Sequence, residues 1–156
     1  MVQPIRPIIL SLFPLLVGAL LSGCAKDRYQ QRADMIKDHT SAFFEHLQAG
    51  HVAEAVWENE QIEALGRQSE TALLRNAEKY DNNQKVREWV LAKTAYEAAA
   101  ENWLALARYF IQKKQYEEAR GTYQRIIESY QDEPYQSYVF RAKTGLRDLD
   151  LILNPT

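Results

Sequence analysis

The side chains best suited to metal or nucleophilic chemistry in this 156-residue chain are three histidines and a single cysteine. His39 and His46 are seven residues apart, so a helix would present them on one face, and His51 follows shortly after. A carboxylate-bridged metal site in a helical bundle needs two Glu-x-x-His pairs, and a zinc-hydrolase helix needs His-Glu-x-x-His. The sequence has neither spacing, so we predict no metal site.

A catalytic nucleophile also requires a base and an orienting group within hydrogen-bond reach. Ser41 is near His39 in the sequence, but side chains two residues apart on a helix point to different faces. Adjacent carboxylates such as Glu117 and Glu118 are typical of solvated helix faces, and the chain has no glycine-rich phosphate loop. We therefore expect no catalytic residue and no cofactor.

The cysteine, Cys24, stands where an apolar segment meets a charged sequence. The first 24 residues hold one charged side chain, Arg6, which precedes the apolar run Ile8–Leu21. This run is shorter than the roughly 20 residues that a membrane-spanning helix needs. A basic start, a short apolar run and two small residues, Ser22 and Gly23, are typical of a secretory signal.

The four residues Leu21-Ser22-Gly23-Cys24 resemble the lipobox of bacterial lipoproteins. The resemblance implies cleavage before Cys24, a lipid on its thiol, and an acyl group such as palmitate on the new amino terminus. More than one acyl chain on a residue gives stable membrane anchoring. On this interpretation residues 1–23 are a cleaved signal peptide and residues 24–156 form the domain. The alternatives are a buried core cysteine or a reactive thiol.

The residues after the cysteine bear on location and partners. In bacterial lipoproteins an aspartate directly after the lipidated cysteine favours the inner membrane, but here Ala25 and Lys26 follow. The resemblance therefore implies, in a Gram-negative cell, the inner leaflet of the outer membrane, facing the periplasm. Loss of Arg6 with the signal peptide lowers the basic residues from 19 to 18 against 21 acidic ones, a net charge of −3. This balance gives no reason to expect a nucleic-acid partner.

Apolar residues after Cys24 recur at gaps of three and four, which predicts amphipathic helices and no strands. Turns are expected at Gly50, at the polar cluster 81–83 and before Pro134. The stripe from Trp89 to Phe110 fits one helix of about 40 Å or two helices in line with a bend. We predict an all-α fold of five or six helices, arranged as antiparallel hairpins because the turns are short.

Two consecutive helical patterns resemble a tetratricopeptide repeat at about residues 101–134. The matching positions are Trp103, Leu106, Ala107, Phe110, Tyr116, Ala119 and Tyr123. The small residues let two helices approach closely, and the aromatic residues fill the space beside them. Ile126 departs from the pattern, which usually has a small residue there. The resemblance implies one clear repeat, flanking helices that complete the core, and a C-terminal helix that caps the stack.

The resemblance also implies a groove in which the first helix of the repeat binds a peptide or helix. Its expected lining is Glu101, Leu104, Arg108, Ile111 and Gln112. Arg108 and Gln112 are one helical turn apart and could bond a partner's backbone or carboxylate. The alternative is an ordinary solvated helix face.

The aromatic residues after Cys24 are expected to serve packing more than ligand binding. We predict that Trp57, Trp89 and Trp103 all belong to the core and the repeat. A cluster of tyrosines near Pro134 either forms an exposed recognition edge or seals the last hairpin. Its members are Tyr130, Tyr135 and Tyr138.

These features predict a lipid-anchored periplasmic protein that binds another envelope protein, as an adaptor or assembly factor and not as an enzyme. One form of this role is a pilot protein that escorts a secretion or pilus subunit to the outer membrane. The alternative is an accessory factor or enzyme of cell-wall metabolism, which would show a cleft with a carboxylate of raised pKa. A third alternative is a purely structural lipoprotein.

Overall fold

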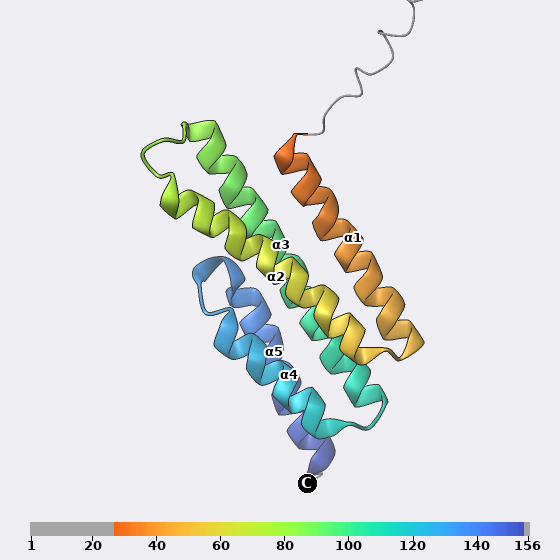
Figure 1. Ribbon diagram of the computed structural model, residues 1–156. Coiled ribbons are helices and arrows are strands. Elements are labelled where there is room, and N and C mark those ends of the chain that lie inside the picture. Colours follow the sequence, from red (N-terminus) through yellow and green to blue (C-terminus); the bar gives the residue numbers. More distant parts are fainter. Residues whose placement is uncertain (1–26, 155–156) are drawn as a thin grey trace, which may run out of the picture.

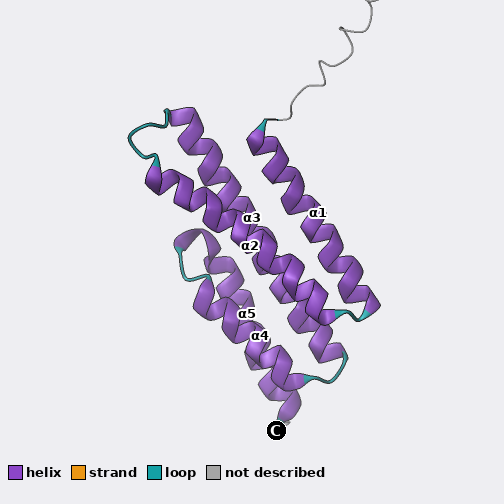
Figure 2. Ribbon diagram, viewed as in Figure 1, coloured by secondary structure: helices purple, strands orange, loops and turns teal. Residues whose placement is uncertain are grey.

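The computed structural model describes residues 27–154, which form five α-helices and one 3-10 turn with no strand (Figure 2). The helices are α1 (Arg28–Ala49), α2 (Val52–Arg75), α3 (Asn82–Gln112), α4 (Tyr116–Ser129) and α5 (Gln136–Leu153), with the turn η1 (Glu133–Tyr135) before α5. The all-α prediction is confirmed. Cys24 and the predicted signal peptide, residues 1–23, lie outside the described residues.

The helices form two layers in which consecutive helices run in opposite directions (Figure 1). In the view of Figure 1, α2 and α4 lie in front of α3 and α5, and α1 packs beside α2 and α3. The central helix, α3, contacts all four other helices. None of the helices between residues 27 and 154 is long and apolar enough to cross a membrane.

The stripe from Trp89 to Phe110 belongs to one helix, α3, of 31 residues. At 1.5 Å per residue its length is about 46 Å. It begins within the polar cluster predicted as a turn, because Asp81 caps its amino terminus. The Asp81 carboxylate accepts a bond from the Gln84 backbone, and the Gln84 side chain accepts one from the Asp81 backbone, at 2.8 and 3.0 Å.

The turns that reverse the chain at the far end from Asp27 depend on left-handed backbone positions. Gly50 closes α1 with φ of 80°, and its amide bonds the Leu47 carbonyl at 3.2 Å. Lys114 between α3 and α4 has φ of 59°, a conformation that favours glycine. Both turns are short enough to place the joined helices side by side.

The core is centred on the repeat-like positions of α3 and α4. Trp103 is 2 % exposed, and Ala107 and Ala119 are fully buried where these helices approach each other. Tyr123 packs from α4 over Gly145 of α5, where an added side chain would overlap the phenol ring. The resemblance to a tetratricopeptide repeat remains a prediction, whereas the packing of these residues is a property of the fold.

Two of the three tyrosines around Pro134 seal the last hairpin, whereas the third, Tyr138, is half-buried. Tyr130 and Tyr135 are buried, and their rings meet edge to face with centroids 6.0 Å apart. The Tyr96 ring of α3 also packs edge to face on both of these rings. Burial raises the pKa of Tyr135 to about 12 and raises that of Tyr130 further, with Glu63 adding to the shift at Tyr130.

The prediction that all three tryptophans are buried is wrong for two of them. Trp103 lies in the core, but Trp57 on α2 is 54 % exposed and Trp89 on α3 is 52 % exposed. Trp89 continues the apolar stripe of α3 toward its amino terminus, past the region that α4 and α5 cover (Figure 1). Periodicity therefore identified the helix face correctly but not the length over which that face is covered.

Candidate functional site

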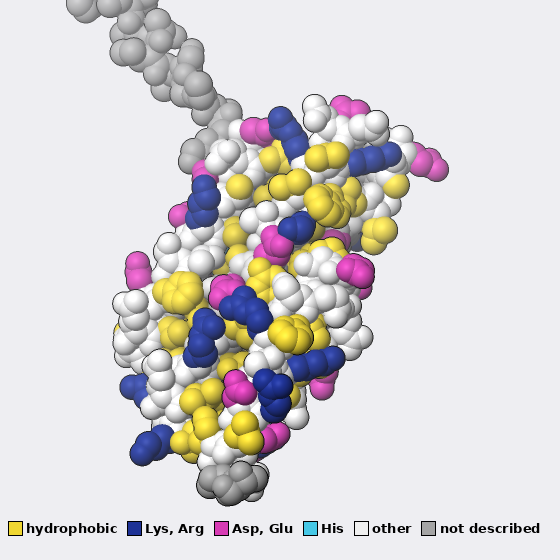
Figure 3. Space-filling model, turned by 180° about the vertical axis from the view of Figure 1, so that it is seen from behind, with side chains coloured by type: hydrophobic (Ala, Val, Ile, Leu, Met, Phe, Trp, Pro, Cys, Tyr) yellow, Lys and Arg dark blue, Asp and Glu magenta, His cyan; other side chains and the backbone are white. Residues whose placement is uncertain are grey.

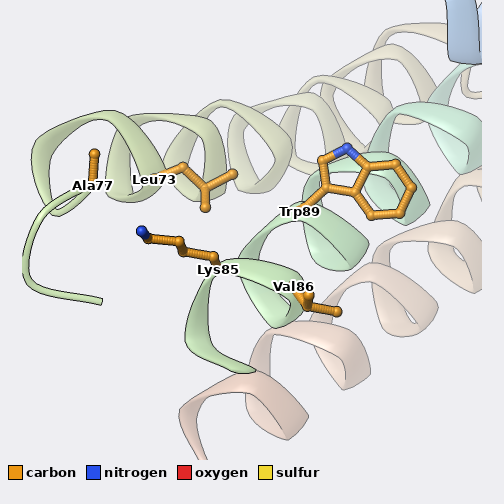
Figure 4. A pocket seen from close by; sticks show the side chains of 5 residues that line it. All are labelled: Leu73, Ala77, Lys85, Val86 and Trp89. Carbon is orange, nitrogen blue, oxygen red and sulfur yellow. The ribbon is translucent and has the colours of Figure 1, made fainter. Parts of the chain in front are cut away.

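Apolar side chains gather on the surface where α2 ends and α3 begins. We call this set the tip patch: Leu73, Ala77, Val86, Trp89 and Val90. A hollow of about 450 Å³ lies within it, and Lys85 completes the lining. Figure 4 shows Leu73 and the Lys85 side chain facing each other across this hollow, with the Trp89 indole at one end.

The tip patch is exposed to an unusual degree for large apolar residues. Val86 is 57 % exposed, Trp89 is 52 % exposed and Val90 is 47 % exposed. Seen from behind, apolar side chains gather over the α2–α3 end with charged side chains around them (Figure 3). Exposed apolar side chains that gather in one place make this end of the molecule a candidate contact site for a protein or a membrane.

The start of the described chain is fixed next to the tip patch. The Asp27 carboxylate pairs with the Arg87 guanidinium on α3 at 2.6 Å. The Tyr29 ring lies between the guanidinium groups of Arg32 and Arg87, each 5.2 Å from its centroid. Val90 lines a shallow hollow together with Asp27 and Tyr29, so the patch and the chain start share one end of the molecule.

A buried ion pair ties three helices together at this same end. The Arg32 guanidinium of α1 donates two bonds to the Glu88 carboxylate of α3, at 2.7 and 2.9 Å. It also donates to the Ser69 hydroxyl of α2 at 3.1 Å. Glu88 is only 3 % exposed, so this two-bonded pair fixes α1 against α2 and α3 in a place that water barely reaches.

The predicted groove on α3 is not an open groove lined by all five residues. Leu104 is 2 % exposed and belongs to the core, because α3 is covered by helices on more than one side. Its assignment to a partner-binding surface is therefore corrected. Ile111 is packed against the core, whereas Gln112 is exposed at the end of α3.

The two charged residues of the predicted groove belong to an ion-pair network with α5. Glu101 accepts two bonds from the Arg141 guanidinium, at 2.6 and 2.9 Å, and Arg108 lies 3.7 Å from the same carboxylate. The hydrogen bonds from Arg141 lower the pKa of Glu101. This shift is opposite to the raised pKa that the cell-wall enzyme alternative requires of a catalytic carboxylate.

Aromatic and charged side chains flank this network and form a second surface. We call it the α3–α5 face: Glu101, Arg108, Tyr138 and Arg141. Phe140 directly precedes Arg141 on α5 and stands at the edge of this face. Phe140 is 71 % exposed, and the Arg141 guanidinium lies 5.7 Å from the centre of the Tyr138 ring. Exposed aromatic residues and arginines are the residue types that contribute most to protein–protein binding energy.

Glu63, the most buried carboxylate of α2, links side chains of neighbouring helices. It accepts bonds from the Trp103 indole at 2.8 Å and from the Tyr130 hydroxyl at 2.7 Å. The Arg125 guanidinium lies 3.2 Å from its other oxygen and 3.9 Å from the centre of the Trp103 ring. These bonds hold α2, α3 and α4 together and occupy the carboxylate from three sides.

Two of the three histidines meet a carboxylate, and the rings of His46 and His51 also lie near each other, with centroids 6.1 Å apart. The His39 ring lies 2.6 Å from the Glu58 carboxylate of α2, and the His46 ring lies 3.9 Å from its other oxygen. Across residues 27–154, no group of three or more His, Cys, Asp or Glu side chains is arranged to hold a metal ion. These contacts join α1 to α2 near the turn at Gly50.

The tip patch was missed by the sequence analysis, although the sequence contains a signal for it. Val86, Trp89, Val90 and Lys93 follow the spacing of one helix face directly after a polar break. Of this face, only Trp89 was assigned to the core, because it begins the apolar stripe that leads to Phe110. A helix face that leads into a loop at the end of a long helix has fewer neighbours to cover it.

No protein-family model matches the chain, and no curated protein or solved structure is significantly similar to it. The functional inference therefore depends on the lipobox-like sequence and on the two surfaces of the helical domain. The tip patch lies beside the chain start, and the α3–α5 face lies further along α3.

Proposed function

We propose that the protein is a membrane-anchored lipoprotein of the cell envelope that acts as an adaptor or assembly factor by binding another envelope protein. The lipobox-like residues before Cys24 support the anchor. Asp27, three residues after Cys24, accepts a bond from Arg87 of α3, which supports a domain held close to the membrane surface. The lipid on Cys24 supplies the location, and the helical domain supplies the binding surface.

The observation that carries the adaptor role is the exposed Phe140, which directly precedes Arg141 of the Arg141–Glu101 pair on α5. A phenylalanine with 71 % of its surface in water adds nothing to the core and gains free energy when a partner covers it. The neighbouring arginines can bond carboxylates of a partner once part of their ion-pair network exchanges. The α3–α5 face therefore combines an apolar anchor with charged groups around it, as protein interfaces do.

Crosslinking in living cells tests this proposal at single-residue resolution. A photo-crosslinking amino acid replaces Phe140 in one strain and Trp57 in another. Both side chains are more than half exposed, and Trp57 is the control because it lies on α2, outside the α3–α5 face. We expect position 140 to capture one defined envelope protein and position 57 not to capture it. Arg108→Glu should weaken the capture at position 140.

Two outcomes would contradict the adaptor role. Capture of the same protein from both positions would show that crosslinking reflects proximity without a specific face. Absence of any product from position 140, with the protein present at normal levels, would leave the α3–α5 face without a partner. A captured secretion or pilus subunit would favour the pilot form of the role.

A further inference from the structure

The tip patch is adjacent to the place where the chain would leave for its lipid anchor. Cys24 is three peptide units before Asp27, so its Cα lies at most about 11 Å from that of Asp27. Asp27 is itself bonded to Arg87, next to Val86 on α3. A lipid on Cys24 would therefore hold the start of α1 and the first turns of α3 close to the bilayer.

The residue types of the tip patch suit the boundary between lipid headgroups and acyl chains. Tryptophan combines a large apolar ring with an N–H donor, and it is enriched at membrane interfaces for that reason. Lys85 lines the hollow, and its long apolar stem can cover apolar surface while the ammonium group reaches the headgroups. Val86, which also lines the hollow, adds exposed apolar area.

From this position and chemistry we infer that the tip patch lies against the lipid surface to which Cys24 attaches the protein. The inference rests on the proposed lipid anchor and adds the orientation of the domain. Two or more acyl chains already retain the protein, so the patch contributes a fixed pose more than it contributes affinity. In this pose Trp89 contacts lipid, and the α3–α5 face remains available to a partner.

Two features connect the patch rigidly to the anchor. The Arg32–Glu88 pair and the Asp27–Arg87 pair both join the start of α1 to α3 near the patch. A short tether on a rigid end allows few orientations, whereas the same tether on a mobile end would allow many. We therefore expect Trp89 to lie close to lipid once Cys24 is lipidated.

Tryptophan quenching by brominated lipid tests the inference. The full lipidated protein is placed in vesicles of phosphatidylethanolamine and phosphatidylglycerol, with bromine on the acyl chains close to the headgroups. The chain has three tryptophans, so we expect brominated vesicles to remove about one third of the emission seen in unbrominated vesicles. Trp89→Phe should abolish this quenching, and the matched variant Trp57→Phe should leave it in place.

The outcomes separate the inference from the function on which it rests. Protein that floats with the vesicles but is quenched equally with and without Trp89 overturns the membrane contact and leaves the anchor intact. Protein that does not float with the vesicles, and carries no lipid by mass, overturns the proposed function itself. The inference is also overturned if bromine does not quench Trp89 in the native protein and, in a separate variant, a photo-crosslinker at position 89 captures a protein. Together these results would assign the patch to a protein partner.

Discussion

Arg32→Met should strongly destabilise the domain, because it leaves a buried carboxylate without its partner. The Glu88 side chain is 4 % exposed and the Arg32 side chain 14 % exposed, so water replaces little of the lost interaction. Removal of one member of a buried pair costs about 3–5 kcal/mol. We expect the free energy of unfolding of Arg32→Met to fall by an amount in this range.

The double variant distinguishes a lost ion pair from lost packing. Arg32→Met with Glu88→Leu replaces both charges with apolar groups of similar length, an exchange that is often neutral or stabilising. We expect the double variant to lie within about 1 kcal/mol of the parent. The coupling free energy between the two sites should therefore be large and favourable to the native pair.

Urea unfolding, followed by tryptophan fluorescence on the mature chain with Cys24→Ser, measures these values. With a slope of about 1.5 kcal/mol per molar urea, Arg32→Met should lower the midpoint by about 2–3 M. Arg87→Met is the matched control because its pair with Asp27 is half exposed, and it should cost less than about 1 kcal/mol. A small effect of Arg32→Met, or a double variant as unstable as the single one, would refute the reasoning.

Three further predictions concern the stability of the domain. Glu63→Ala leaves the buried Trp103 indole and Tyr130 phenol donors without an acceptor, so it should lower the free energy of unfolding by about 2–5 kcal/mol, measured by urea unfolding. Glu63→Gln keeps an oxygen and should lower it markedly less. Equal losses in the two variants would contradict this prediction. Gly121→Ala should stabilise the domain by up to about 1 kcal/mol, because nothing lies within 4 Å of the added carbon and alanine favours the helix. Gly145→Ala should destabilise the domain, because the added carbon would overlap the Tyr123 ring. Because the pKa of Tyr135 is raised to about 12 from 10.0, its contribution to stability is complete below pH 10 and decreases as the pH rises through 12. Tyrosinate absorbance should then show this phenol ionising only at that high pH or on unfolding, and Tyr135→Phe should weaken the loss of stability above pH 10.

The helices and the centre of the core could be predicted because their signals are local. Apolar residues three and four apart define a face, and the Trp103 and Ala107 positions fall on the face where α3 meets α4. The glycine at position 50 marked the first turn correctly for the same reason, since its left-handed φ is a property of one residue.

The exposure of a face depends on what covers it, and the sequence does not state this. Leu104 is buried because α3 has helices on several sides, and Trp89 is exposed because α3 extends past two of them. Arg32 and Glu88 are 56 residues apart, and no spacing rule connects them. Glu101 and Arg108 were predicted from the sequence as surface residues, but their pairing with Arg141 and the exposure of Trp89 follow only from the packing of the helices.

The central claim is that Cys24 begins the mature protein and carries its membrane anchor. Intact-mass measurement of the protein extracted from membranes, followed by sequencing of its first peptide, tests this most directly. We predict a chain that starts at Cys24, with a lipid on the thiol and an acyl group on the amino terminus. A chain that still contains the residues before Cys24, or that has an unmodified thiol, would contradict the claim.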